Sequence, residues 1–504
     1  SLWENTLKEG SLRHDLIRPE SLAGELRDTR QLISAWRLDL KDPAWFGNDN
    51  ENCTAFYHWN RAFEERCKKG RWLCPEDRIS LLHCVIREKL PAAAGAIVLL
   101  GFVVFNPDQA ALLTVLLDQG AAVCRLSIES RQDKAVLWKS KDSKGELDRM
   151  VRWVRYWIEN DPGSGIAVVV PDLRVRRQAI ERALEDILMP GRDHSDPLQK
   201  PWNISMGTPL LRLPMIETAF DLLKLLDLRV DIQDIGRVLR SPWLRGAARE
   251  RNSRALLEKC LRNNYPRHIR SSELRYRAGE IKKHDNRHNE LPVAEHQPQA
   301  WNCPELSIIL NFLKRFERDH RGAQPASAWA ESIDHLLASV GWPLVEELPE
   351  QHDVNWQTLQ AWREALRDLA SLDATVPPLR RGMAISQLKK ICHGRIFQAR
   401  TAAAPVQVLG LYEISGLRFD HLWVMGLNND NWPPGARPNP FIPARLQQAA
   451  QSPGSSPQRE LAVASTITRR LLETAPDCVF SYAGTVDGEE RLASPLLESH
   501  TISN

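Results

Sequence analysis

The spacing of apolar residues predicts that the chain begins with helices and that its first strands follow them. Within residues 1–90, apolar side chains recur three and four positions apart, which is typical of amphipathic helices. Short aliphatic and β-branched runs come only after this region, and they flank another helical pattern. The predicted helices are residues 22–36, 56–67 and 109–117, and the predicted strands are residues 96–100 and 121–126.

The clearest strand pattern lies further along the chain. Residues 166–170 are nearly all β-branched, which is typical of a parallel strand buried on both faces. Helical patterns at residues 146–160 and 174–188 flank this run, so this part predicts an α/β domain. Strand patterns return only after a long helical stretch, at residues 406–411, 421–427 and 478–482. We therefore expect one α/β domain that a large, all-helical insertion, residues 216–371, divides in the sequence.

Length and composition favour a folded protein of several domains. The chain has 504 residues, of which 43% are hydrophobic and 26% are charged. Its longest apolar run, residues 92–105, is shorter than the roughly 20 residues that a membrane-spanning helix needs, and its start does not resemble a secretion signal. Nine cysteines are too few for a disulfide scaffold, so we expect reduced thiols and a cytoplasmic location. Because the first residue is Ser1 rather than Met, we expect a fragment or a processed chain.

The sequence carries none of the common catalytic patterns. A P-loop needs a glycine-rich turn that ends in Gly-Lys-Ser or Gly-Lys-Thr, and neither occurs. The nearest match to a metal-dependent nuclease, Glu280-Ile281-Lys282, lies in a polar stretch far from Asp172 along the chain. The cysteines and histidines are not spaced as zinc ligands. We therefore expect no metal, no cofactor and no catalytic residue in this chain.

A local excess of basic residues is the one positive indication of a binding partner. Between Arg237 and Arg287 the chain has 15 Lys and Arg against 5 Asp and Glu, a net charge of +10, although the whole chain carries only +3. Basic helices with interleaved aromatic residues suit phosphate contacts and base stacking on DNA. The alternative is a solvated basic face that acidic residues of other segments neutralise. The residues predicted to contact DNA are Arg237, Arg240, Arg245, Arg249 and Arg254, with Trp243 as a stacking surface.

The segment from Val408 to Pro433 resembles motif V of superfamily 1 helicases without a gap. The residues that shape this motif are kept, namely Gly416, Leu417, Phe419, Gly426 and Pro433. Its polar positions are changed: Gly410 stands for the motif's Thr, Tyr412 for its His, Ser415 for its Lys and Arg418 for its Glu. The segment thus keeps the residues of the fold and loses those that serve phosphoryl transfer.

Two other segments resemble helicase motifs in the same degenerate way. The segment from Leu100 to Gln109 resembles motif II, with matches at Phe102, Asn106, Pro107 and Gln109. Leu100 and Gly101 replace the two acids that would bind magnesium and position water. The stretch between Arg459-Glu460 and Ser481-Tyr482 resembles motif VI, where Glu473-Thr474-Ala475 replaces the Thr-Arg-Ala that would supply an arginine.

This pattern is similar to the inactivated helicase subunits of bacterial recombination nucleases, the AddB and RecC type, and most closely to a group of bacterial DNA repair proteins related to AddB. The resemblance covers roughly residues 90–500 and includes Leu239-Arg240-Ser241-Pro242-Trp243, which looks like a stretch of that group's helical insertion. It implies an α/β fold with a RecA-like parallel sheet, a large all-helical insertion and a mostly helical N-terminal region. The implied domains are a 1B-like region with the end of a degenerate 1A-like domain (1–126), a RecA-like domain 2A in two parts (127–215 and 372–504) and a 2B-like helical insertion (216–371).

The resemblance also implies a function. We expect a catalytically inactive helicase-like core that binds single-stranded or forked DNA, mostly at phosphates, and guides it to a helicase or nuclease partner subunit. One alternative is a fragment of an active ATP-dependent helicase-nuclease, although the lost motif II acids argue against it. The other is a non-enzymatic protein-interaction scaffold that does not bind DNA. No membrane partner is expected.

Overall fold

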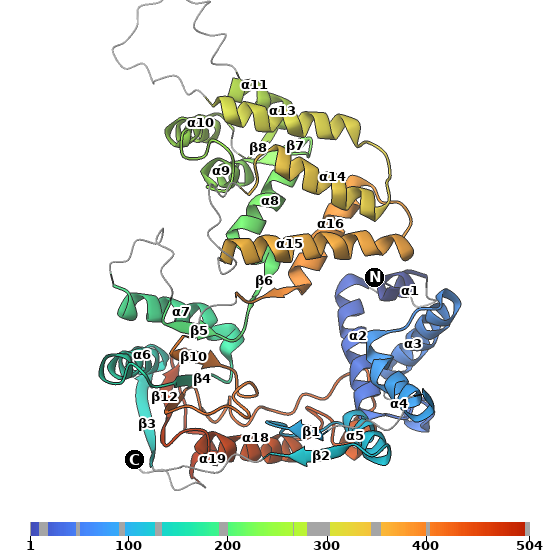
Figure 1. The fold of residues 1–504 in the computed structure, drawn as a ribbon, viewed down its shortest axis with the longest axis vertical. Helices are drawn as coiled ribbons and strands as arrows, with labels where there is room; N and C mark the ends of the chain where they lie inside the picture. The colour runs from blue at the N-terminus through green and yellow to red at the C-terminus, as the bar shows by residue number, and fades with distance from the viewer. Residues whose placement is uncertain are drawn as a thin grey trace, which may run out of the picture. The chain divides into compact units, whose positions relative to one another are not determined.

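The structure, a computed structural model, divides the chain into two compact units (Figure 1). Unit 1 combines residues 1–205 with residues 403–504, and unit 2 is the segment between them, residues 206–402. Two distant parts of the sequence therefore build unit 1. The residues that the structure describes are 2–9, 19–46, 51–89, 96–126, 134–190, 200–265, 267–279, 303–343, 354–399 and 404–498.

A seven-stranded, mostly parallel sheet forms the centre of unit 1. Its strands are β3 (Lys134–Asp142), β4 (Ile166–Val169), β5 (Trp202–Ile204), β10 (Val406–Leu409), β11 (His421–Val424), β12 (Asp477–Val486) and β13 (Glu489–Glu490). The order is β13-β12-β11-β4-β10-β5, β3 also pairs with β12, and only the β12–β13 pair is antiparallel. The central strands β4 and β11 are buried along their whole length. The predicted α/β class with a parallel sheet is therefore confirmed.

Helices cover both faces of this sheet. α6 (Ser143–Asn160) and α7 (Leu173–Leu188) lie on one side, where the Trp153 ring of α6 packs against Trp423 of β11. α18 (Pro457–Leu472) lies on the other side, because its buried Ala464 and Leu471 share a core with Leu422, the β11 neighbour of Trp423. Side chains of a strand alternate between faces. The short α19 (Pro495–Glu498) joins the same core as α18.

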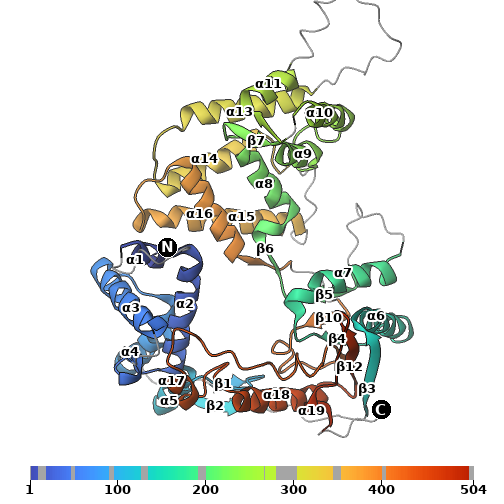
Figure 2. The same cartoon turned by 180° about the vertical axis from the view of Figure 1, so that it is seen from behind.

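The N-terminal part of unit 1 is mostly helical and has its own core. Its helices are α1 (Leu2–Glu9), α2 (Pro19–Trp36), α3 (Glu51–Gly70), α4 (Arg78–Lys89) and α5 (Pro107–Asp118), and β1 (Ala96–Leu99) pairs in parallel with β2 (Ala122–Arg125) in a separate two-stranded sheet. Phe441 and Ile442 join the core of α1, α2 and α3, just before α17 (Ala444–Ala449). The long connection after β11 therefore packs on the N-terminal helices, as Figure 2 shows.

Unit 2 is mostly helical, but it is not all-helical as predicted. Its helices are α8 (Pro214–Lys224), α9 (Ile232–Arg240), α10 (Arg251–Asn264), α11 (Ser271–Gly279), α13 (Pro304–Asp319), α14 (Ala326–Ser339), α15 (Val354–Ala370) and α16 (Arg381–Gly394). Two antiparallel pairs join them: β6 (Thr208–Pro209) with β9 (Ile396–Phe397), and β7 (Arg229–Asp231) with β8 (His268–Arg270). Strands of two or three residues are too short to show an alternating pattern, so the sequence does not reveal them.

The boundaries of unit 2 differ from those of the insertion predicted at residues 216–371. The unit begins at Met206 and includes α16, which the sequence analysis assigns to the second part of the α/β domain. Ala384, Leu388 and Cys392 of this helix are fully buried in the core of unit 2. Ile385 and Ile391 are partly buried against the same core. An amphipathic pattern shows which side of a helix is buried, but not which domain the helix packs against.

The nine cysteines provide a direct test of this packing. Burial raises the pKa of the Cys392 thiol and of the Cys478 thiol to about 12, whereas Cys84 and Cys124 are exposed. Because the thiolate is the reactive form, we expect iodoacetamide to modify Cys84 and Cys124 in the native protein, and the two buried thiols only after unfolding. Peptide mass spectrometry of the alkylated protein measures this. Equal labelling of Cys392 and Cys84 at neutral pH would contradict the fold.

Candidate functional site

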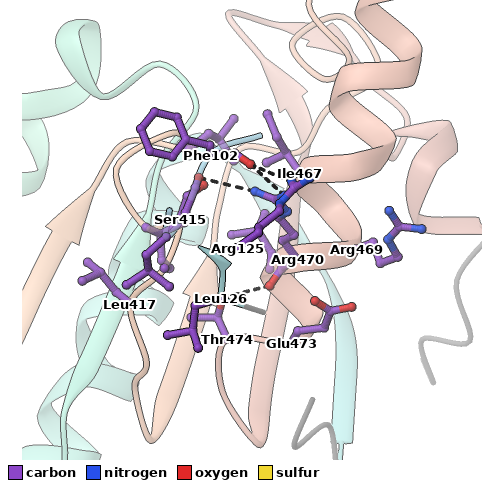
Figure 3. Close-up of a pocket in the computed structure, with 16 residues that line it drawn as sticks. Phe102, Arg125, Leu126, Ser415, Leu417, Ile467, Arg469, Arg470, Glu473 and Thr474 are labelled. Atoms are coloured by element: carbon purple, nitrogen blue, oxygen red, sulfur yellow. Dashed lines mark hydrogen bonds between the residues drawn. The ribbon is translucent and has the colours of Figure 1, made fainter. Parts of the chain in front are cut away.

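Four separate segments of the sequence line one cavity of unit 1, with a volume of about 390 Å³ (Figure 3). The ends of β1 and β2 contribute residues 100–102 and 125–126, the loop after β10 contributes residues 411 and 414–417, and the end of α18 contributes residues 467–474 with gaps. Three of them, all except residues 125–126, belong to the stretches that resemble helicase motifs II, V and VI. The structure thus brings the three motif-like segments together around one space.

The motif II-like and motif V-like segments touch through their backbones at two glycines. Gly101 has φ +78°, and a Cβ atom placed on it would lie 2.4 Å from the carbonyl oxygen of Ser415. Gly416 has φ +88°, and a Cβ atom there would lie 3.2 Å from the Cα atom of Gly101 and 3.0 Å from Leu100. Only glycine adopts this left-handed conformation without strain. The positions of the two motif II acids are therefore used for close packing.

The residues that match motif II build the start of α5. Asn106 Oδ1 accepts a hydrogen bond from the backbone N–H of Gln109 at 2.8 Å, and Gln109 Oε1 accepts one from the N–H of Asn106 at 3.1 Å. Pro107 occupies the first position of the helix. This arrangement is a capping box, which satisfies backbone donors at a helix N-terminus. The match is therefore explained by helix geometry, without any catalytic role.

The changed polar positions of the motif V-like loop do not converge on the cavity as a group. The N–H of Gly410 donates a hydrogen bond to Glu413 Oε2 at 2.8 Å, and this bond stabilises the turn after β10. Tyr412 and Arg418 are exposed, and the cavity lining includes neither of them. Of the changed positions, Ser415 alone lines the cavity.

Three arginines that the sequence analysis does not select line the cavity, namely Arg125, Arg469 and Arg470, and two of them share one acceptor. Arg470 Nη2 donates to the carbonyl oxygen of Phe102 at 2.9 Å, and Arg125 Nη2 donates to the same oxygen at 3.1 Å. The motif VI-like triplet begins at Glu473, at the end of α18, whereas the arginine of α18 that bonds to Phe102 is Arg470, almost one helical turn earlier. The doublet Arg469-Arg470 in a helix is the only sequence signal that could have indicated it.

The predicted DNA-contacting arginines of unit 2 are mostly engaged in ion pairs. Arg237 Nε lies 2.7 Å from Asp221 Oδ2, and Arg245 Nε lies 2.6 Å from Glu305 Oε2. Arg240 pairs with Glu258. Each of these guanidinium groups remains 40–55% exposed, so it can still contact solvent. The ion pairs hold neighbouring helices together and reduce the positive charge of the stretch.

Of the six predicted contacts, Arg254 needs correction, Trp243 is partly buried, and Arg249 is exposed. Arg254 is only 1% exposed and pairs with Glu250, so it cannot reach a DNA phosphate in this structure. Trp243 is half-buried against the core of unit 2, which limits its use as a stacking surface. Arg249 is exposed and makes no ion pair with another described residue. Helical spacing could not separate these cases, because burial depends on which helix packs opposite.

No protein-family model matches the chain, and comparison with curated proteins gives no significant match.

Within the described part of the chain, no group of three or more His, Cys, Asp or Glu side chains could hold a metal ion. The nuclease-like triplet at Glu280 lies outside the described residues. Across the helices that the structure describes, none combines the length and the apolar character needed to cross a membrane.

Proposed function

We propose that this chain is a catalytically inactive, superfamily 1 helicase-like core that binds DNA and guides it to a motor or nuclease subunit. In this proposal the sheet of unit 1 is a RecA-like domain 2A, and unit 2 is an inserted 2B-like domain. One observation carries the proposal: the three motif-like segments line one cavity, while the position of the second motif II acid is filled by the contact between Gly101 and Ser415. That contact leaves no room for a carboxylate at Gly101.

The proposed DNA surface consists of the exposed cations of α10 and its surroundings. Arg251, Lys259 and Arg262 fall at positions i, i+8 and i+11, which lie on one side of a helix. Arg262 pairs with Glu258, whereas Arg251 and Lys259 are exposed and pair with no other described residue. Exposed cations without carboxylate partners are the groups best able to bind phosphates and release counterions. Arg249, two residues before α10, is also exposed.

Fluorescence anisotropy with single-stranded and forked DNA across a salt series tests this proposal. The double variant Arg251→Glu and Lys259→Glu is expected to weaken DNA binding about tenfold or more, and to lower the slope of log K against log salt by about two. The reason is that each reversal removes one phosphate contact and adds a repulsive charge. DNA-stimulated ATP hydrolysis, measured in parallel, is expected to be absent.

The matched control carries the same change of net charge on unit 1. Arg174→Glu with Arg445→Glu reverses two exposed arginines outside the proposed surface, and it should leave the affinity within about twofold. Equal weakening by both double variants would mean that only the net charge of the protein matters. Robust ATP hydrolysis would contradict an inactive core and favour the active helicase-nuclease.

A protein-interaction scaffold is the second candidate function. The ion pairs of Arg237, Arg240 and Arg245 favour it, because they neutralise much of the basic stretch within unit 2 itself. In that case no DNA binding should be detected even at low salt, where phosphate contacts are strongest. The same anisotropy series therefore separates the two functions.

A further inference from the structure

Two guanidinium groups share a single acceptor at the cavity of unit 1. The Nη2 atoms of Arg125 and Arg470 both lie within 3.1 Å of the carbonyl oxygen of Phe102, so they are at most about 6 Å apart. Arg470 Nη1 also donates to the carbonyl oxygen of Gly101 at 3.4 Å. No carboxylate of the described residues forms a hydrogen bond or an ion pair with either guanidinium. Two positive charges therefore lie side by side, held only by carbonyl dipoles.

The pKa of Arg470 reflects this excess of positive charge. Burial, followed by the positive charge of Arg125, lowers the pKa of Arg470, and the charge of Glu473 opposes this only in part. Figure 3 shows Arg125 and Arg470 together beside Phe102, whereas the side chain of Arg469 points away from them. An anion between the two guanidinium groups would compensate both charges. The pair is therefore prepared for a negatively charged ligand.

Donor geometry and cavity shape indicate the class of ligand. A guanidinium has five N–H donors; the bonds above use two on Arg470 and one on Arg125. Two such planar groups suit the oxygens of a phosphate. The cavity of about 390 Å³ is also lined by apolar side chains, namely Leu100, Leu126, Ile414 and Leu417, and by Ser415. This volume and these walls suit a small organic molecule.

We propose that Arg125 and Arg470 bind the phosphate group of a small phosphomonoester in this cavity. Glu473 is the only carboxylate among the lining residues, so binding does not require a divalent cation. The ligand bridges the end of β2 and the end of α18, and it therefore stabilises unit 1. The proposal does not rest on DNA binding, because its residues belong to unit 1 and the proposed DNA surface belongs to unit 2.

Isothermal titration calorimetry of the full chain tests the site. Inorganic phosphate and adenosine monophosphate are titrated separately, with a chelator present and the ionic strength matched with chloride. We expect saturable binding of both probes, about tenfold or more weaker in Arg470→Gln and in Arg125→Gln, because each variant loses one set of charge-assisted hydrogen bonds. Similar affinities would assign recognition to the phosphate alone. Tighter binding of the nucleotide would add contacts of its organic part with the apolar walls.

The matched control is Arg445→Gln, which makes the same change of charge at an exposed position of unit 1 that does not line the cavity. It should bind both probes within about twofold of the unchanged protein. Absence of saturable binding of both probes at millimolar concentration, or equal weakening in Arg445→Gln, would overturn the proposal. If Arg470→Gln does not fold, Arg125→Gln still decides, because the Arg125 side chain is exposed.

Discussion

Replacing Gly101 with alanine is expected to destabilise unit 1 by about 3–5 kcal/mol. Two costs combine. The backbone of Gly101 has φ +78°, which a residue with a Cβ atom adopts only with strain, and the new Cβ atom would lie 2.4 Å from the carbonyl oxygen of Ser415. Neither atom belongs to a flexible side chain that could rotate away. The substitution should therefore separate the end of β1 from the loop after β10.

Gly488 provides a matched control for this substitution. Its φ is +84°, but a Cβ atom there meets nothing within 4 Å, so Gly488→Ala carries the backbone strain alone and should cost about 1 kcal/mol. Hydrogen exchange followed by mass spectrometry measures the local free energy of opening of β1 and of residues 411–417. Similar losses in both variants would show that the contact between Gly101 and Ser415 contributes nothing.

The same contact bears on the helicase resemblance. Leu100→Asp with Gly101→Glu would restore the two acids of motif II at the positions where the resemblance expects them. The Glu at position 101 would meet the same carbonyl oxygen as alanine does, so the double variant should lose stability without gaining ATP hydrolysis. This is the physical argument against an active motor within this chain.

The fold was predictable where burial is complete and unpredictable where it is one-sided. β4 and β11 are buried along their whole length, so β4 shows in the sequence as an unbroken apolar run and β11 as one that follows His421. β3 pairs with β12 alone, and its exposed Lys139 and Lys141 interrupt the apolar pattern, so the sequence analysis misses it. Lysines of this kind protect an edge strand from pairing with other chains. The exposed lysines that make β3 hard to recognise in the sequence thus serve to protect the edge of the sheet.

The candidate site was predictable in its segments and not in its contacts. The resemblance to helicase motifs II and V identifies residues 100–109 and 408–433. In contrast, Arg240 and its partner Glu258 are 18 positions apart on two helices, and the pair forms only when α9 packs against α10. The same packing decides which arginines stay exposed. A count of basic residues therefore overestimates the charge that DNA would meet.

Replacing Arg254 with methionine is expected to destabilise unit 2 by about 3–5 kcal/mol, because it leaves a buried carboxylate without its counter-charge. Arg254 Nη2 donates to Glu250 Oε2 at 2.8 Å and to the carbonyl oxygen of Arg245 at 2.7 Å. Glu250 in turn accepts the backbone N–H groups of Glu305 and Leu306, at 2.6 and 3.2 Å. The buried pair thus joins α10 to the first turn of α13.

Arg262 in the same helix provides the control, since it pairs with Glu258 at the same spacing of four residues but is 49% exposed. Arg262→Met should cost about 1 kcal/mol or less, because water screens an exposed pair. Adding Glu250→Gln to Arg254→Met should recover part of the loss, since the buried charge is removed while an acceptor for α13 remains. Hydrogen exchange in α10 and α13 measures all three variants. If Arg254→Met instead weakened DNA binding and left this exchange unchanged, Arg254 would be the phosphate contact that the sequence predicts, and its burial in unit 2 would be wrong.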